Sequence, residues 1–157
     1  MIREKGKKLE EYIELYNRKA DSPFEHDPRY QLFFNPEHGF CEIANVGSMI
    51  IAGQLCGDIK FWRNAIEEVA RVSGINTCGT FCVRHIKPYI RAAGFKIEKE
   101  EPLEIGFTRY YCIDPKTGQK ATCSPGFKDA KGNIAHYVTW KVIRESGDQG
   151  NREIVGE

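Results

Sequence analysis

The 157-residue sequence lacks the features that mark membrane, secreted and nucleic-acid-binding proteins. Its formal net charge is only +1, so no clear electrostatic signal points to DNA, RNA or an acidic membrane as a partner. The uncharged stretch from Ile43 to Cys56 is too short and too polar to span a bilayer. The basic N-terminus lacks the apolar segment of a secretory signal. We therefore expect a cytoplasmic globular protein.

The sequence is not poor in cysteine, but it lacks the ligand spacing that is typical of a metal site. The six cysteines stand at positions 41, 56, 78, 82, 112 and 123. Cys78 and Cys82 form one close pair, and no second close pair of cysteines or histidines follows, whereas structural zinc sites use two. Without an export signal, disulfides are not expected either. We expect reduced, buried cysteines and no bound metal.

Hydrophobic periodicity predicts one domain over residues 1–144 and a polar, disordered tail over residues 145–157. Apolar residues with helical spacing predict a helix over residues 3–19. Three short strands follow, and the Asn, Pro and Gly residues between them favour an antiparallel meander. The predicted strands cover residues 30–34, 40–44 and 48–55.

The next segment has the order strand, helix, strand. Asp58 is a candidate N-cap of a helix that Gly74 ends, and a strand over residues 77–83 follows. A helix that connects two strands in this way makes them parallel neighbours. We therefore predict an α/β fold with a mixed, mostly antiparallel central sheet flanked by helices. The remaining predicted elements are a short helix over residues 86–93 and strands over residues 95–101, 108–113, 120–124 and 135–143.

The junction GQLCGDIKFW (residues 53–62) carries most of the functional information, because a strand ends and a helix begins within it. The N–H groups of a first helical turn have no intrahelical partner, and the helix dipole adds positive potential there. Gly57 would let a phosphate approach the backbone. Asp58 opposes this, since its carboxylate would cap the same amides and repel an anion. The local sequence leaves open a phosphate site and an ordinary capped turn.

The order of elements and two short motifs resemble the GCN5-related N-acetyltransferase family. Residues 54–57, Gln-Leu-Cys-Gly, match the start of that family's Q/R-x-x-G-x-G/A loop, although Ile59 stands where the family has its last small residue. Residues 89–95, YIRAAGF, look like the family's helix that ends in aromatic-aromatic-x-x-x-Gly-Phe. The resemblance spans roughly residues 28–143. It implies an acyl-CoA N-acyltransferase-like fold, with acetyl-CoA as cosubstrate and an amine-bearing molecule as acceptor.

The resemblance also implies where the cosubstrate lies. In that family the amides at the helix start face the CoA pyrophosphate, and the main chain of the preceding strand runs beside the pantetheine arm. The two parallel strands separate to admit the thioester. Carried over to the matching positions, these roles fall on Ile51, Ala52, Gly53, Gln54, Gly57, Asp58 and Ile59.

Acetylation of an amine needs a base for the amine proton and an acid for the leaving thiolate. The resemblance puts the acid on a Tyr just before x-x-x-Gly-Phe, where this sequence has Ile90. Tyr89 precedes it and points about 100° away on a helix, so Tyr89 is either a displaced acid or a packing residue. Glu42, on a strand, and His85, at a helix start, are the base candidates. Glu42 could equally be solvated, and His85 could equally cap the helix.

Two other functions stay open at this point. Cys56 precedes a helix N-terminus, where the dipole favours a thiolate, and His136 lies on a later strand, so the two could form a cysteine hydrolase. Alternatively, the fold binds CoA or has lost catalysis, and serves as an interaction protein. Its partner surface would then be the aromatic residues of the late strands, Tyr110, Tyr111, Tyr137 and Trp140.

Overall fold

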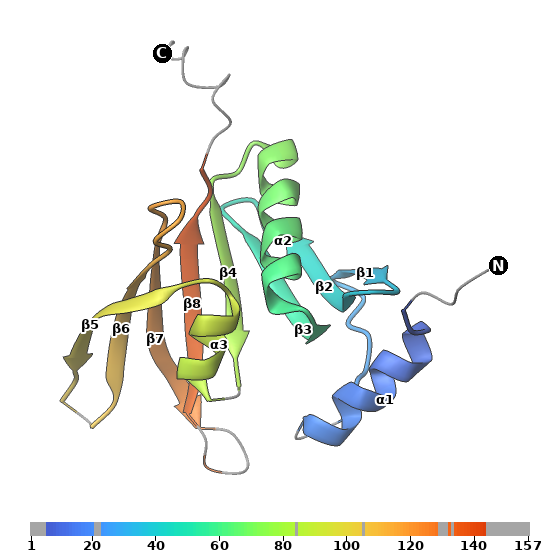
Figure 1. Ribbon diagram of the computed structural model, residues 1–157, viewed down its shortest axis with the longest axis horizontal. Helices are drawn as coiled ribbons and strands as arrows, with labels where there is room; N and C mark the ends of the chain where they lie inside the picture. Colours follow the sequence, from blue (N-terminus) through green and yellow to red (C-terminus); the bar gives the residue numbers. More distant parts are fainter. Residues whose placement is uncertain are drawn as a thin grey trace.

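The computed structural model describes residues 6–20, 23–83, 85–104, 106–128, 132 and 134–143. Within these residues, three helices and one sheet of eight strands form the fold (Figure 1). The helices are α1 (Leu9–Lys19), α2 (Ile59–Ser73) and α3 (Ile86–Ala92). The strands are β1 (Gln31–Asn35), β2 (Gly39–Asn45), β3 (Ile50–Gly57), β4 (Thr77–Cys82), β5 (Lys96–Pro102), β6 (Thr108–Ile113), β7 (Lys120–Lys128) and β8 (Ile134–Lys141).

The strand order is β1-β2-β3-β4-β8-β7-β6-β5. Within the described residues, β3 and β4 are the one parallel pair, and every other neighbouring pair is antiparallel. The predicted α/β class, with a mixed and mostly antiparallel sheet flanked by helices, is therefore confirmed. The predicted tail over residues 145–157 lies outside the described residues.

The helix α1 begins at Leu9, later than the predicted start at residue 3. The N–H of Lys8 donates to the Glu11 carboxylate (2.7 Å), a bond that marks the helix start. Gly6, just before it, has φ +72°, and a Cβ there would lie 2.0 Å from the carbonyl oxygen of Pro36. The chain therefore approaches the β1–β2 turn in a conformation that suits glycine and is not helical.

The strands β1, β2 and β3 form the predicted antiparallel meander, with one irregularity. The register shifts between the Cys41–Leu55 pair and the Ile43–Ala52 pair, so β3 has one more residue than β2 in this interval. Such a β-bulge reverses the face to which all later side chains of the strand point. The bulge therefore decides which residues of β3 meet which helix.

The helix α2 has both predicted ends. The Asp58 carboxylate accepts a hydrogen bond from the N–H of Phe61 (3.2 Å), and Gly74 ends the helix at φ +74°. The strand β4 then runs parallel to β3, as the strand–helix–strand order predicts. In this unit a single residue, Asp58, separates the end of β3 from the start of α2.

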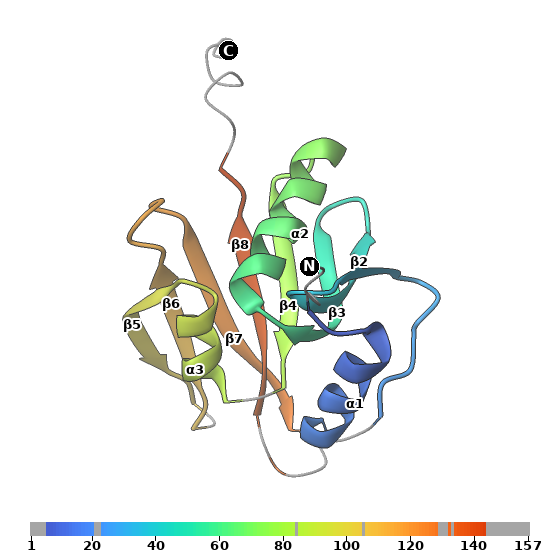
Figure 2. The ribbon, with the colours of Figure 1, turned by 45° about the vertical axis from the view of Figure 1, so that its right-hand side comes forward.

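The four strands after α3 lie in antiparallel order, and β8 returns to the middle of the sheet beside β4 (Figure 2). The strand β7 continues to Lys128 rather than ending at residue 124, although Pro125 and Gly126 look like a turn. A register shift against β8 between Pro125 and Lys128 accommodates the proline.

Two clusters of buried side chains lie on opposite faces of the sheet. The larger includes Trp62 and Ile66 of α2 and Ile90 of α3, and the smaller contains Tyr12 of α1. Phe40 belongs to the smaller cluster and its neighbour Cys41 to the larger. Because successive strand residues point to opposite faces, α1 and α2 cover opposite faces of the meander.

A buried polar network joins α2 to the β6–β7 turn. The Arg63 guanidinium donates to the carboxylates of Glu67 (3.0 Å) and Asp114 (2.8 Å) and to the side-chain oxygen of Gln119 (2.6 Å). The indole N–H of Trp140 also donates to Glu67 (2.7 Å). These charges are buried and paired, which is the condition under which a folded protein tolerates them.

Candidate functional site

The strands β3 and β4 separate in the middle of the sheet. They pair at Ile50–Cys78, Ile51–Gly79 and Ala52–Thr80. Both strands are fully described, and beyond Ala52–Thr80 they continue without pairing to each other. At this last pair, the Thr80 hydroxyl donates to the Ala52 carbonyl (3.3 Å). The separation of these two strands was implied by the family resemblance, and the structure contains it.

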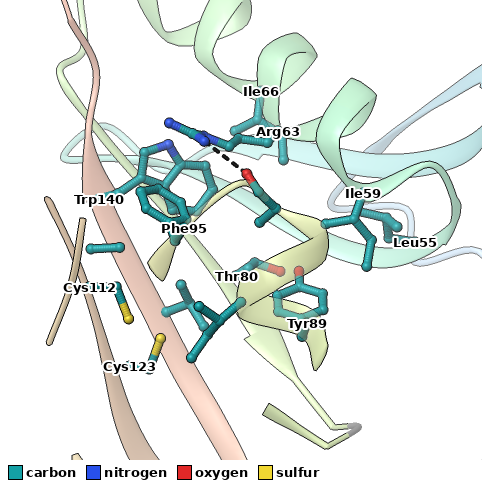
Figure 3. Close-up of a pocket in the computed structure, with 14 residues that line it drawn as sticks. Leu55, Ile59, Arg63, Ile66, Thr80, Tyr89, Phe95, Cys112, Cys123 and Trp140 are labelled. Carbon is teal, nitrogen blue, oxygen red and sulfur yellow. Dashed lines mark hydrogen bonds between the residues drawn. The ribbon is translucent and has the colours of Figure 1, made fainter. Parts of the chain in front are cut away.

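An apolar cavity lies between the gap and the helices α2 and α3 (Figure 3). It is narrow, because the centre of a water molecule has only about 20 Å³ of room in it. A shallower groove continues it between the two helices, where His85, Pro88 and Ala92 form the mouth. The cavity is lined by Leu55, Ile59, Arg63, Ile66, Thr80, Tyr89, Ile90, Ala93, Phe95, Cys112, Ala121, Cys123, Val138 and Trp140.

A second hollow lies on the opposite face of the sheet, and we call it the aromatic groove. Phe81 and Tyr137 point to this face, because their neighbours Cys82 and Val138 belong to the core under α2. Thr80 lines both hollows, so the gap between β3 and β4 is bordered by a cavity on each face of the sheet. The aromatic groove is lined by Tyr30, Ile51, Ala52, Thr80, Phe81 and Tyr137.

The two neighbouring residues Tyr89 and Ile90 have different surroundings. Ile90, at the position of the family's usual acid, is only 3% exposed and packs in the core. Tyr89 is half-buried and lines both the apolar cavity and the groove that continues it (Figure 3). Of these two neighbours, Tyr89 is the one that brings a hydroxyl group to this cavity, which Thr80 also lines.

Glu42 lies opposite the bulge of β3 and is only 1% exposed. Its carboxylate accepts hydrogen bonds from the N–H (3.3 Å) and side-chain amide (2.9 Å) of Gln54 and from the N–H of Asp27 (2.9 Å). It also lies 2.7 Å from Nδ1 of His26, whose side chain is 43% exposed. We call the two residues the Glu42–His26 pair. Sequence analysis missed His26, because it lies in a loop with no periodic signal.

The predicted loop at residues 54–57 is strand, because β3 extends to Gly57 and a single residue, Asp58, precedes α2. Gly57 has φ +113°, and a Cβ there would lie 2.1 Å from the carbonyl oxygen of His38. The close approach of β2 therefore already requires glycine at this position. A ligand is not needed to explain it.

The first turn of α2 is partly occupied by groups of the protein. The N–H of Asp58 donates to the His38 carbonyl (2.9 Å), and the Asp58 carboxylate caps the N–H of Phe61. The amides of Ile59 and Lys60 have no intrahelical acceptor at this position. The His38 ring stacks on Phe61 with centroids 4.0 Å apart, and its Nδ1 lies 3.2 Å from the Asp58 carboxylate. An anion here would meet two amides and one carboxylate.

His85 precedes α3 and is exposed at the mouth of the groove between α2 and α3. Its side chain makes no capping hydrogen bond within the described residues. It therefore lies on the same side of the sheet as the apolar cavity, whereas Glu42 lies near the aromatic groove. The two predicted base candidates are not brought together.

The cysteine-hydrolase alternative is wrong, because Cys56 and His136 point to opposite faces of the sheet. Cys56 is buried with Tyr12 and Phe40 on the α1 side. His136 lies next to Tyr110, with ring centroids 5.8 Å apart. It is two residues before the core residue Val138 on β8, so its side chain points to the same face of the sheet, the face that α2 covers. Burial lowers the pKa of His136 below its usual value, against a smaller opposing effect of a backbone hydrogen bond at Ile134.

The remaining predictions concern cysteines, metals, membranes and aromatic residues. All six cysteines are buried, as expected, and burial raises the pKa of the Cys78 thiol to about 12. Among the described residues, no cluster of three or more metal-ligating side chains is found, and none of the helices has the length and apolar character to cross a membrane. The four aromatic residues do not form one surface, since Trp140 is core and Tyr137 faces the other side.

Comparisons with known proteins give a similarity of fold and no match by sequence. No family model matches the sequence, and no curated protein matches it either. The fold is similar to that of the ribosomal-protein-S18-alanine N-acetyltransferase from Escherichia coli, with a TM-score of 0.47 and 10% sequence identity. The alignment covers 88% of this chain and 90% of that enzyme.

Proposed function

We propose that this protein is an N-acetyltransferase that uses acetyl-CoA to acetylate a primary amine. The observation that carries the proposal is the separation of β3 and β4 beyond the Ala52–Thr80 pair, with a cavity on each face of the gap. Backbone groups that lose their ladder partners need other hydrogen-bond partners. The pantetheine arm of CoA carries amide groups that can pair with an exposed strand edge. A gap that is open on both faces also lets two substrates meet from opposite sides.

The cosubstrate lies on the side of α2 and α3 in this proposal. The pantetheine arm runs beside the unpaired edge of β3, which begins after the Ala52–Thr80 pair, and Leu55 and Ile59 supply apolar contacts from the lining of the cavity. The pyrophosphate meets the amides at the start of α2, near Gly57 and Ile59. The Asp58 carboxylate reduces the positive potential there, so the anion contributes less to binding than it would at an uncapped helix.

The transfer step moves the acetyl group from sulfur to nitrogen. The lone pair of the neutral amine attacks the thioester carbonyl carbon, a C–N bond forms, and the C–S bond breaks. Tyr89 lines the cavity, and its hydroxyl gives a proton to the CoA thiolate. Solvent then returns a proton to the Tyr89 oxygen. The nitrogen gives up its proton to a base on the acceptor side.

We assign the base to the Glu42–His26 pair. Glu42 alone is enclosed by four hydrogen-bond donors, so an incoming amine does not reach it directly. His26 is partly exposed, and with Nδ1 held by Glu42 its other ring nitrogen can accept a proton, directly or through water. His85 lies on the acetyl-CoA side, where it is better placed to contact the cosubstrate than the amine.

A second candidate function is CoA binding without acetyl transfer. Two observations favour it: Ile90 replaces the family's usual acid, and Asp58 weakens the helix start as an anion site. Both candidates use the same cavity, and the cytoplasm is the proposed location for both.

Acetyl transfer is tested by incubating the purified protein with acetyl-CoA and a panel of primary amines. We expect amine-dependent release of the CoA thiol and a product heavier by one acetyl group in mass spectrometry. If acetyl-CoA binds but no amine raises the release of the CoA thiol above background hydrolysis, the transferase function is rejected and CoA binding without transfer is supported. Absence of acetyl-CoA binding in the millimolar range would reject both.

A further inference from the structure

The aromatic groove has a composition that identifies the kind of acceptor it fits, an inference that rests on the proposed function. Phe81 and Phe127 are each more than half exposed, at 52% and 53%. Tyr137 lies between their strands, with its ring centroid 4.8 Å from that of Phe81, and Phe127 lies 6.1 Å from Phe81. A patch of large exposed rings marks a binding surface more often than scattered apolar residues do.

The apolar surface continues from these rings toward the gap. Tyr137 donates its hydroxyl hydrogen to the sulfur of Met49 (3.3 Å), so the polar end of its ring is already engaged. Ile51 and Ala52 form the floor near the last pair of β3 and β4, and Tyr30 forms a wall. A ligand in this groove therefore meets mostly ring faces and aliphatic carbon, and Thr80 borders the groove beside the gap.

The Glu42 carboxylate lies beside the Tyr30 ring that forms this wall. A Cβ built on Gly53 would lie 3.1 Å from the Tyr30 ring and 3.2 Å from the Glu42 carboxylate, so ring and carboxylate meet at the same point of β3. An aromatic face attracts a cation through its quadrupole, and a nearby carboxylate adds to that attraction. His26 binds this carboxylate from the solvent side. The combination favours a ligand that carries both a protonated amine and an apolar ring.

We propose that the aromatic groove binds a small primary amine whose nitrogen is joined through a short chain to an aromatic group. The aromatic group of the acceptor lies against Phe81 and Tyr137, and the nitrogen points toward Thr80 and the gap, where the thioester carbon would arrive. A purely aliphatic diamine lacks the ring that fills the groove. A neutral aromatic alcohol lacks the charge that the carboxylate attracts.

The test measures binding without catalysis, by NMR titration of the isotopically labelled protein in the absence of acetyl-CoA. The three probes are phenethylamine, 2-phenylethanol and butane-1,4-diamine. We expect phenethylamine to bind at least tenfold more tightly than either other probe and to shift the amide signals of Phe81 and Tyr137. Equal or tighter binding of the diamine or of the alcohol would overturn the proposal.

The variant Phe81→Ala is expected to weaken phenethylamine binding at least fivefold. Phe34→Ala, which removes a half-exposed ring on β1 outside the groove, is the matched control and leaves binding unchanged. Unchanged phenethylamine binding by Phe81→Ala would overturn the proposal. If that variant does not fold, the comparison of the three probes on the wild-type protein decides the proposal. A peptide with an N-terminal Phe that binds more than tenfold tighter than phenethylamine would overturn the small-amine assignment. Because acetyl-CoA is absent, failure of this titration is distinct from failure of the proposed transferase function.

Discussion

The Thr80 hydroxyl donates to the carbonyl oxygen of Ala52 at the last residue pair that joins β3 to β4. This bond lies where the two strands separate, and Thr80 lines the hollow on each face of the sheet. The separation is thus fixed at a defined point, beyond which the edge of β3 is available to a ligand. The proposed acetyl-CoA site, the proposed acid and the aromatic groove all depend on this point.

Replacing Tyr89 with Phe tests the proposed acid. The variant keeps the ring that lines the cavity and removes only the hydroxyl, so we expect little change in the KM for acetyl-CoA. The kcat should fall by about 10² to 10⁴, the usual contribution of a general acid. Tyr111→Phe is the control, since its hydroxyl donates to Glu101 away from the site. Steady-state kinetics that give equal kcat for Tyr89→Phe and wild type would remove the acid assignment.

Replacing Asp58 with Asn tests the electrostatics of the helix start. Asn also caps helices, so α2 keeps its first-turn hydrogen bond while one negative charge is lost. Removal of a charge at a helix terminus is worth about 0.3–1 kcal/mol, and CoA should bind about two- to fivefold more tightly. Calorimetric titration measures the change. Weaker binding by this variant would show that the pyrophosphate does not lie near Asp58.

Replacing Arg63 with Met tests the buried polar network. The change leaves the carboxylates of Glu67 and Asp114 buried without their cation. Removing one partner of a buried ion pair costs about 3–5 kcal/mol, and we expect the free energy of unfolding in urea to fall by that amount. Arg91→Met, on the exposed face of α3, should change it by less than about 0.5 kcal/mol. Similar losses for both variants would contradict the network's structural role.

His136 should make the protein less stable in mild acid. Burial lowers its pKa in the folded state, whereas the unfolded chain has the ordinary value of about 6.5. The unfolded state therefore binds the proton first, and stability falls as the pH drops below about 6.5 toward the lower folded pKa. His136→Leu removes this effect. Urea unfolding at pH 7.5 and 5.5 should show a smaller loss for the variant, and an equal loss would refute the explanation.

Most of the fold could be predicted because local signals agree with the final structure. Asp58 and Gly74 mark the two ends of α2 through capping and a positive φ, and the short turns between β1, β2 and β3 allow only a meander. The end of β7 was missed because Pro125 and Gly126 are turn residues by local chemistry. Only the pairing with β8, which tolerates a shifted register there, carries the strand past them.

The candidate site was less predictable, because one extra residue in β3 changes which side chains share a face. In a regular strand Cys56 would lie on the same face as Ala52, the face to which His136 also points. The bulge between Ala52 and Leu55 turns Cys56 to the other side, and this separates the proposed Cys–His pair. Pairs such as Glu42 and His26, joined through a loop, leave no periodic signal in the sequence.

Calorimetric titration with acetyl-CoA, comparing wild type with Ala92→Trp, tests most directly whether the cavity beside α2 and α3 is the acyl-CoA site. Ala92 is exposed at the mouth of that groove, so a Trp there blocks entry without disturbing the core. Val72→Trp adds the same bulk at an exposed position near the other end of α2. We predict that wild type and Val72→Trp bind acetyl-CoA alike and that Ala92→Trp binds at least tenfold more weakly. Equal binding by all three proteins, or no binding by wild type at millimolar acetyl-CoA, would contradict the account.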